Sequence, residues 1–274
     1  MKLPEDFPRD IEVVATDLDR TLISDDYVLR PRTLAALARA HEAGIRVIVA
    51  TGRMVQSARR VLEPAKLTDP LVCYQGAVVA EADGTWLLHA PIEPGLAHEA
   101  IEAVEAAGFG LNVYVRDELY VAHVTPEAER YSTFQQIPLH TVGDLGTWLD
   151  EPPTKLVCIG DPDALDVLGV EMRERFEGRL WVTKSLPFFL EFAAEGVSKG
   201  SGLDFLAERL GFSKGRTICF GDGENDLDLM EWGGFGVAVA NADERLKALA
   251  GWVCPPVAEE GVAQVLEALL DSRG

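Results

Sequence analysis

Four short polar segments, far apart in the chain, carry residue types that together can bind a phosphate and a divalent cation. In chain order they are Asp17-Leu18-Asp19-Arg20-Thr21, Ala50-Thr51-Gly52-Arg53, Val197-Ser198-Lys199-Gly200 and Gly221-Asp222-Gly223-Glu224-Asn225-Asp226. Carboxylates, a hydroxyl and a lysine are the groups that metal-assisted phosphoryl transfer requires. Each segment alone is a weak signal, so the prediction rests on the occurrence of all four in this order.

The acidic residues predict a cation site. Residues two apart on a strand point to the same side, so Asp17 and Asp19 are expected to face one site. If Asp222 and Asp226 join them, carboxylates at about 4 Å repel by about 1 kcal/mol in water, or about 4 kcal/mol at an effective dielectric of about 20. Such a cluster needs a cation, and hard oxygen ligands beside a phosphate favour Mg²⁺. The alternative is that these acids are helix caps and solvated loop residues.

The second and third segments predict phosphate contacts. Thr51 follows a strand and Gly52-Arg53 is expected to open a helix, so the hydroxyl, free backbone N–H groups and the helix dipole would form an anion site. Lys199 precedes a helical pattern and is expected to place its ammonium between the phosphate and Asp17. Outside this context, Thr51 would be an ordinary N-cap and Lys199 a solvated surface residue.

The segment from Gly221 to Asp226 is the most specific of the four, because it follows an apolar strand and precedes a helical pattern. Asp222 is expected to bind the metal directly, and Asp226 either to bind it or to orient water bound to it. Asn225 is a candidate phosphate ligand. A calcium loop is the rival interpretation, but it would need alternating acids and a terminal glutamate that this segment lacks.

Apolar strands that alternate with helices predict the scaffold. Buried strands are expected at residues 11–16, 45–50, 216–220 and 236–240, and helical spacing at 34–41 and 203–210 ends at Gly44 and Gly211. Strands that are apolar on both faces are typical of a parallel sheet covered on both sides. The fold class is therefore predicted to be α/β, with a Rossmann-like, doubly wound, parallel-sheet core domain.

The middle of the chain has a different pattern and predicts an inserted α+β cap domain. We assign residues 83–191 to this cap, and residues 1–82 and 192–274 to the core. Short strand candidates in the cap are residues 85–89, 111–115, 119–123, 156–159, 179–182 and 188–192, and its helices are expected at 96–104 and 165–176. Most of its aromatic and histidine side chains are expected to pack in the core rather than contact a ligand, namely Tyr114, His123, Trp181, Phe188 and Phe189.

Over nearly the whole chain, the four segments resemble the motifs of the haloacid dehalogenase superfamily, specifically its phosphatases with a large α+β cap (Cof-type, subfamily IIB). The resemblance implies that Asp17 is a nucleophile that forms an aspartyl-phosphate, and that Asp19 is the general acid and base. It implies metal ligation by Asp17, the backbone carbonyl of Asp19 and Asp222, with Asp226 as a further candidate. The implied phosphate-binding residues are Thr51, Gly52, Lys199 and Asn225, with Arg53 and Arg20 as additional candidates.

Two positions depart from the family pattern. The family most often has Gly at the position of Arg20, and Asn at the position of Gln75 in Tyr74-Gln75-Gly76-Ala77. The wider superfamily tolerates many residues at the first position, so Arg20 is not expected to abolish the chemistry. It is either a substrate contact that alters specificity or a solvated arginine on a turn.

The motifs predict a Mg²⁺-dependent phosphatase that acts on a small phosphorylated metabolite, with a sugar phosphate favoured and the cap closing over the site. A phosphosugar mutase would share the aspartyl-phosphate, and a glycosyl-phosphoglycerate or sucrose-phosphate phosphatase would share the motifs. A non-catalytic metabolite-binding protein is supported only by Arg20 and Gln75 and ranks last. A monomer or a homodimer is expected.

Composition restricts the partners and the compartment. The 274 residues are 47% hydrophobic, which is ample for a buried core, and the net charge of −20 argues against nucleic acid or anionic membrane as a partner. The first six residues have no apolar signal core and no apolar stretch approaches the ~20 residues that span a bilayer, which predicts a cytoplasmic protein. The cysteines lack the spacing of a zinc site or a redox dithiol, and three of them are expected to be buried, reduced thiols; the four are Cys73, Cys158, Cys219 and Cys254.

Overall fold

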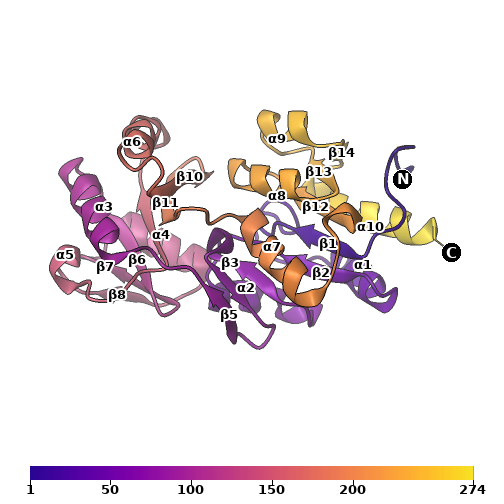
Figure 1. Ribbon diagram of the computed structural model, residues 1–274, viewed down its shortest axis with the longest axis horizontal. Helices are drawn as coiled ribbons and strands as arrows, with labels where there is room; N and C mark the ends of the chain where they lie inside the picture. The colour runs from indigo at the N-terminus through magenta and orange to yellow at the C-terminus, as the bar shows by residue number, and fades with distance from the viewer. Residues whose placement is uncertain (274) are drawn as a thin grey trace.

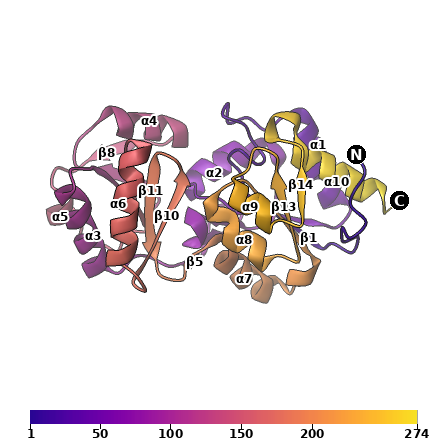
Figure 2. The ribbon, with the colours of Figure 1, turned by 90° about the horizontal axis from the view of Figure 1, so that it is seen from above.

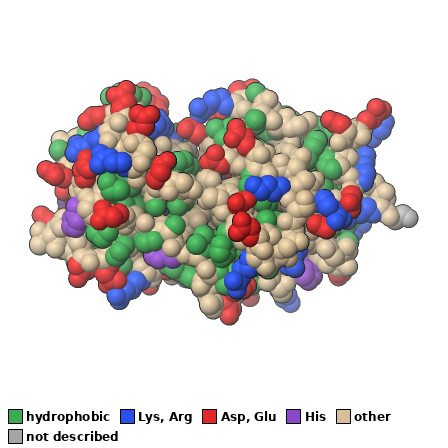
Figure 3. Space-filling view, in the orientation of Figure 1, with side chains coloured by type: hydrophobic (Ala, Val, Ile, Leu, Met, Phe, Trp, Pro, Cys, Tyr) green, Lys and Arg blue, Asp and Glu red, His purple; other side chains and the backbone are tan. Residues whose placement is uncertain are grey.

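Two lobes lie side by side along the long axis of the molecule (Figure 1). The computed structural model describes residues 1–273, except the side chain of Phe134. Both chain termini lie at the far end of one lobe, and the middle of the chain forms the other lobe (Figures 1 and 2). Acidic side chains are spread over both lobes on the face shown in Figure 3, in keeping with the net charge of −20. Within residues 1–273, we find no helix with the length and apolar character needed to cross a membrane.

The lobe that holds the termini is built on a parallel five-stranded sheet with the order β14-β13-β12-β1-β2. Every residue of the central strand β1 is buried, because both faces of the sheet are covered. The parallel sheet confirms the predicted α/β core. The strands are β1 (Val13–Thr16), β2 (Arg46–Val49), β12 (Thr217–Gly221), β13 (Phe235–Val239) and β14 (Trp252–Cys254).

Helices cover both faces of this sheet, which makes the core doubly wound (Figures 1 and 2). Helices α1 (Pro31–Glu42) and α10 (Gly261–Asp271) pack against each other on one face, and α7 (Lys199–Leu210), α8 (Leu227–Trp232) and α9 (Glu244–Leu249) lie on the other. Helix α2 (Val55–Leu62) follows β2. Short 3₁₀ turns span Glu63–Ala65, Tyr74–Gly76, Lys214–Arg216, Glu224–Asp226 and Val257–Glu259.

A small antiparallel sheet extends the core beyond β2. Its strands are β3 (Leu71–Cys73), β4 (Val78–Ala80) and β5 (Trp86–His89). Residues 85–89 were grouped with the cap from the sequence, but the turn at residues 83–84 folds β5 back onto β4, and Trp86 packs against the core cluster. The strand pairing therefore places β5 beside the core, and the predicted domain division itself stays a prediction.

The second lobe contains a six-stranded sheet with the order β10-β11-β9-β6-β7-β8. Its strands are β6 (Leu111–Val115), β7 (Glu118–Val121), β8 (Leu139–Thr141), β9 (Lys155–Ile159), β10 (Leu180–Leu186) and β11 (Phe189–Ala194). Its helices are α3 (Pro94–Ala106), α4 (Pro126–Gln135), α5 (Leu145–Trp148) and α6 (Pro162–Arg175). Strand β11 runs three residues past the predicted cap boundary at residue 191.

Side-chain alternation gives this cap sheet two different faces. The apolar residues of α3 and α6 pack on one face, where they meet Leu111, Leu156 and Phe192 in a separate hydrophobic cluster. The intervening residues of the same strands point the other way, toward the core lobe. These core-facing residues include Asn112, Tyr114, Lys155, Val157, Phe189 and Glu191.

All four cysteines are buried free thiols, as expected for three of them. Burial raises the pKa of the Cys158 thiol to about 12, which keeps it protonated and unreactive near neutral pH.

Candidate active site

The first segment lies where β1 ends, at the carboxyl edge of the parallel sheet. The Asp17 N–H donates to the Phe220 carbonyl at 2.9 Å, which extends the β1–β12 ladder and brings Asp17 beside the start of the Gly221–Asp226 loop. Leu18 turns into the core, where it is fully buried. Parallel strands end at the same edge of a sheet, so the topology joins segments that are about 200 residues apart in sequence.

Arg20 adopts a left-handed backbone conformation, with φ of +63°. Glycine reaches this region without steric cost, which explains why a glycine is usual at this position in the family. The Arg20 side chain is 42% exposed and its Nε lies 3.7 Å from Asp222 Oδ2. Arg20 therefore borders the acidic cluster, and it is neither fully solvated nor buried within the site.

Lys199 forms the centre of the acidic cluster. It is the first residue of α7, which Ser198 and Ser201 begin with a reciprocal capping box. Its side chain is fully buried, and Nζ donates to Asp17 Oδ1 at 2.5 Å and to Asp226 Oδ1 at 2.6 Å. Burial opposes the charged form of Lys199, but the two carboxylates outweigh it and raise the pKa of its ammonium above the usual lysine value.

Asp222 and Asp226 have different surroundings. Asp226 Oδ2 accepts from the backbone N–H groups of Asp222 at 2.9 Å and Gly223 at 3.0 Å, so both of its oxygens are engaged. Asp222 Oδ1 accepts from the Thr21 hydroxyl at 3.4 Å. Burial and the nearby Asp226 raise the pKa of Asp222 to about 7. Burial also raises the pKa of Asp17 well above its usual value, although Lys199 opposes this shift.

The donor set fits a divalent cation. Carboxylate oxygens of Asp17, Asp222 and Asp226 all lie within 4.8 Å of one another. Three ionised carboxylates and the Lys199 ammonium leave a net charge of −2, which one Mg²⁺ would balance. Because both Asp226 oxygens already accept hydrogen bonds, Asp17 and Asp222 are the stronger candidates for direct ligation, and Asp226 is placed to orient the loop and Lys199.

Thr51 lies beside these acids, but its segment does not open a helix as expected. Helix α2 begins at Val55, and the Thr51 hydroxyl accepts from the Arg53 N–H at 3.1 Å. The first N–H groups of α2 donate instead to the carboxylate of Asp117, from Val55 at 3.0 Å and from Gln56 at 2.9 Å. The cap therefore occupies the anion site at the start of this helix, and the helix dipole is not available to a phosphate at Thr51.

Arg53 is tied to Asp19. Its guanidinium makes a two-pronged contact with the Asp19 carboxylate, at 2.7 Å from Nε and 2.6 Å from Nη2. Arg53 is 1% exposed, and its Nη1 also donates to the Ser57 hydroxyl at 3.0 Å. A bidentate arginine fixes the orientation of a carboxylate. Arg53, from the second segment, therefore holds the Asp19 side chain in place beside the acidic cluster.

Three residues that the sequence motifs did not assign to the site join it to the cap. The Gln75 amide accepts from Asn225 at 3.0 Å and donates to Glu191 at 3.4 Å. Glu191 also accepts from Lys155 at 3.0 Å, and Lys155 donates to the Gly52 carbonyl at 2.9 Å. These contacts link the phosphate segment, the metal segment and the cap. Lys155 and Glu191 each lie within an apolar strand, and charged residues are rarely buried unless they are paired. That pattern is the signal by which the sequence could have indicated a buried ion pair here.

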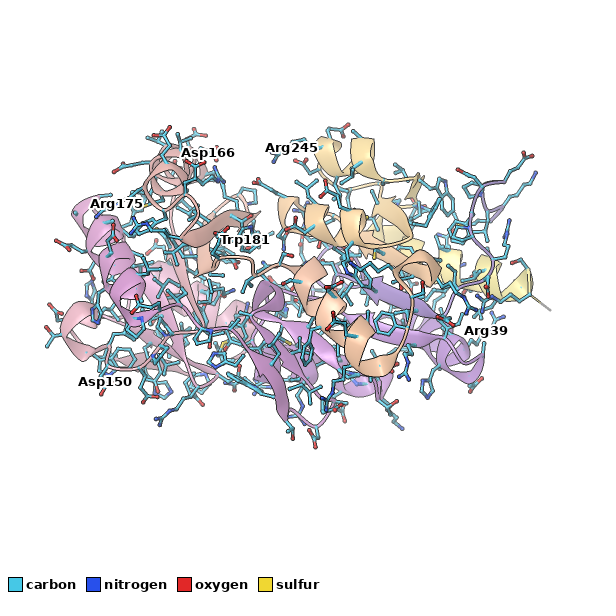
Figure 4. All side chains as sticks on the ribbon, in the orientation of Figure 1. Arg39, Asp150, Asp166, Arg175, Trp181 and Arg245 are labelled. Atoms are coloured by element: carbon cyan, nitrogen blue, oxygen red, sulfur yellow. The ribbon has the colours of Figure 1, made fainter. Side chains whose placement is uncertain are left out.

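The predicted residues converge on a small chamber of about 40 Å³ between the lobes. Lys199 and Asp226 lie against Asp17, and Arg20 lines a neighbouring cleft of about 1260 Å³. At the rim, Glu224 pairs with Arg173 of the cap at 3.8 Å and with Arg245 at 2.8 Å, and Arg245 lies at the cap-facing edge of the core (Figure 4). Of the predicted residues, those that line the chamber are Asp17, Asp19, Thr51, Gly52, Arg53, Asp222 and Asn225.

The aromatic and histidine residues of the cap divide between packing and the cleft. Tyr114 and Phe189 are buried in the core cluster and Trp181 packs against it, as expected. His123 and Phe188 are exposed and line the larger cleft, and Phe189 borders both hollows. The expectation of core packing therefore holds for three of the five residues.

Comparisons with known proteins agree with this geometry. A family model described as haloacid dehalogenase-like hydrolase matches residues 14–266. The 5-amino-6-(5-phospho-D-ribitylamino)uracil phosphatase YitU of Bacillus subtilis is 28% identical over 263 residues, which cover 93% of this chain and 96% of the relative.

Two solved structures show the same fold. TM0651 from Thermotoga maritima is 30% identical with a TM-score of 0.81, over 94% of this chain and 97% of that one. The haloacid dehalogenase subclass IIB sugar phosphatase BT4131 has a TM-score of 0.82 at 21% identity, over 93% and 98% of the two chains. Because the family model spans most of the sequence, the chain belongs to the haloacid dehalogenase-like hydrolases.

Proposed function

We propose that this protein is a Mg²⁺-dependent phosphatase that hydrolyses a small phosphorylated metabolite, with a sugar phosphate as the leading candidate, through an aspartyl-phosphate on Asp17. The protein is a phosphoric monoester hydrolase of the haloacid dehalogenase-like family, in which relatives such as YitU are named phosphatases. The observation that carries the proposal is the buried cluster in which Lys199 bridges Asp17 and Asp226 within reach of Asp222. A cytoplasmic location and a monomeric or dimeric state stay predictions.

In the proposed first step, a carboxylate oxygen of Asp17 attacks phosphorus as the bond from phosphorus to the leaving oxygen breaks. Asp19 donates a proton to that oxygen, which leaves as an alcohol. In the second step, Asp19 takes a proton from water as the water oxygen attacks phosphorus, and Asp17 is released with inorganic phosphate. Arg53 supports this role because it holds the Asp19 carboxylate in one orientation.

The remaining residues bind and neutralise the phosphoryl group. The fixed ammonium of Lys199 stabilises charge on the phosphoryl oxygens, and its positive charge opposes the rise that burial causes in the pKa of Asp17. Thr51, Gly52 and Asn225 line the chamber, and we expect the Thr51 hydroxyl, the Gly52 backbone and the Asn225 amide to contact the phosphate. When bound by Asp17, Asp222 and the Asp19 carbonyl, Mg²⁺ supplies positive charge that offsets the carboxylates and the phosphate.

The test is release of inorganic phosphate from a panel of phosphosugars and other phosphomonoesters, with Mg²⁺ and with a chelator. The Asp17→Asn variant keeps the shape of the nucleophile and removes its charge, so phosphate release is expected to fall to background. The matched control is Asp6→Asn, an exposed acid near the terminus, which is expected to leave the rate unchanged. Release that survives Asp17→Asn or chelation would refute the proposal, and an isomerised phosphosugar would indicate a mutase instead.

A further inference from the structure

The chamber has a core wall and a cap wall with different chemistry. The core wall carries the residues proposed for catalysis, and residues of the cap form the opposite wall. The described residues of the cap wall are Tyr131, Gln135, Ser185, Leu186, Phe189 and Glu191. The chamber is small, at about 40 Å³, and it lies beside the cleft of about 1260 Å³, which has room for the larger part of a substrate.

The polar groups of the cap wall are mainly hydrogen-bond acceptors. Gln135 is 3% exposed, its amide nitrogen donates to the Tyr131 hydroxyl at 3.3 Å, and its Oε1 is a buried oxygen with no hydrogen-bond partner among the described residues. The Ser185 hydroxyl donates its proton to Glu191, which leaves its oxygen lone pairs to accept. A buried acceptor without a partner destabilises the protein, so this wall is suited to a ligand that donates a hydrogen bond.

The cap wall offers no positive charge to a second anionic group. Among the described residues that line it, none is a lysine or an arginine. The cations behind and beside it are paired, since Lys155 binds Glu191 and the Gly52 carbonyl and Arg53 binds Asp19. A carboxylate or a second phosphate of the substrate that packs against this wall would lose water and meet the Glu191 carboxylate instead of a cation.

We propose that Gln135, supported by Ser185 and Glu191, is a specificity-determining residue that selects phosphate esters of neutral polyols. The selected alcohol carries a hydroxyl on the carbon beside the phosphoester carbon, and this hydroxyl donates to Gln135 Oε1. Alcohols that carry a carboxylate on the carbon after this hydroxyl-bearing carbon are rejected, which excludes 3-phosphoglycerate-type substrates. This inference rests on the proposed function and narrows its substrate class.

The test uses three phosphomonoesters of equal chain length: glycerol 3-phosphate, propane-1,3-diol monophosphate and 3-phosphoglycerate. They differ by a single hydroxyl or by a carboxylate. One hydrogen bond to a buried acceptor predicts a kcat/KM about tenfold higher for glycerol 3-phosphate than for the propanediol ester. A similar or larger preference over 3-phosphoglycerate is expected. The fourth substrate, p-nitrophenyl phosphate, lacks both groups and reports the core chemistry alone.

The Gln135→Leu variant should bring the ratio between glycerol 3-phosphate and the propanediol ester close to one. The matched control is Gln136→Leu at the neighbouring exposed position, which should keep the native ratio. If Gln135→Leu fails to fold, the kcat/KM ratios that the native protein shows among the three matched esters still test the specificity inference.

Different results would refute the specificity of Gln135 and the phosphatase function. Turnover of p-nitrophenyl phosphate with equal kcat/KM for the three matched esters, or an unchanged ratio in Gln135→Leu, would overturn the specificity inference and leave the phosphatase intact. An absence of Mg²⁺-dependent turnover on all four esters would refute the proposed function, and the specificity inference with it.

Discussion

Removal of the Lys155 ammonium should destabilise the protein far more than its position on a cap strand suggests. Lys155 and Glu191 are 1% and 3% exposed, and Lys155 Nζ lies 3.0 Å from Glu191 Oε2. At that distance, an effective dielectric of about 20 gives an attraction of about 5.5 kcal/mol, which offsets the cost of burying both charges. The pair also connects the cap to Gly52 and Gln75 of the core.

The Lys155→Met variant leaves the Glu191 carboxylate buried without a cation, and a loss of about 3–5 kcal/mol in the free energy of unfolding is expected. The double variant Lys155→Met/Glu191→Gln removes both charges together, so it should be more stable than the sum of the single effects by about 2–3 kcal/mol. Because Glu191 and Tyr131 outweigh the effect of burial and raise the pKa of Lys155, its contribution is fully present at neutral pH. It is lost only as the pH rises through that folded-state pKa, above the usual lysine value.

The assay is urea-induced unfolding of the four proteins of this cycle, followed by far-UV circular dichroism at pH 7.5. The control is Lys214→Met, which breaks a surface pair with Asp204 whose side chains are 55% and 47% exposed. That change should cost less than about 1 kcal/mol. A cost for Lys155→Met no larger than that of the control, together with a coupling below about 0.5 kcal/mol, would refute the reasoning.

Three further outcomes are expected. Asp117→Ala removes the cap of α2 and a 2.8 Å hydrogen bond from the Tyr74 hydroxyl, and should destabilise by about 1–3 kcal/mol in urea unfolding, more than the exposed-cap control Asp161→Ala. Since the pKa of Asp222 is raised to about 7, a proton competes with the metal, and calorimetric titration should find Mg²⁺ affinity about tenfold weaker at pH 6 than at pH 8. Arg20→Gly removes the steric cost of a side chain on a left-handed backbone. It should raise the free energy of unfolding by up to about 1 kcal/mol in the same urea assay while phosphate release continues.

Each of these outcomes has a contrary result that would count against it. Equal losses of stability in Asp117→Ala and Asp161→Ala would mean that the contact from Asp117 to the start of α2 adds no more stability than an exposed helix cap. Equal Mg²⁺ affinity at the two pH values would mean that Asp222 does not titrate in the metal-free protein. The metal-free protein should also lose stability as the pH rises from about 4 to 7, because the folded state holds the extra proton in that range. A loss of turnover in Arg20→Gly would assign Arg20 a direct role in the reaction.

The core and its catalytic segments were predictable because their signals are local. Buried strands such as β1 and β12 appear as short apolar runs, and each polar segment follows directly after a strand or before a helix. In a parallel sheet all such strand ends lie at one edge, so the strands alone predicted that Asp17 and Asp222 meet. Lys199 begins a helix, and its place beside them was predicted from its position among the four segments. The family resemblance followed from these same local segments.

The cap contacts could not be predicted in the same way, because they depend on how two lobes dock. Nothing near Asp117 in sequence indicates that its carboxylate accepts from the first N–H groups of α2, which lie 61 and 62 residues earlier. Thr51-Gly52-Arg53 was predicted to start that helix because Thr51 follows a strand and is a common N-cap residue. Strand β5 was grouped with the cap because an isolated apolar strand does not reveal which sheet it joins.

The sequence by itself determined the fold class and identified the segments that meet in the acidic cluster, because periodicity and residue type act over short distances. Only the tertiary structure decided which cap residues face the chamber. Alternation along β9 and β11 turns Lys155 and Glu191 toward the core, and the end of α4 brings Gln135 to the same wall. The substrate selection that we propose depends on these contacts between lobes, and the contacts exist only once the two sheets have packed against each other.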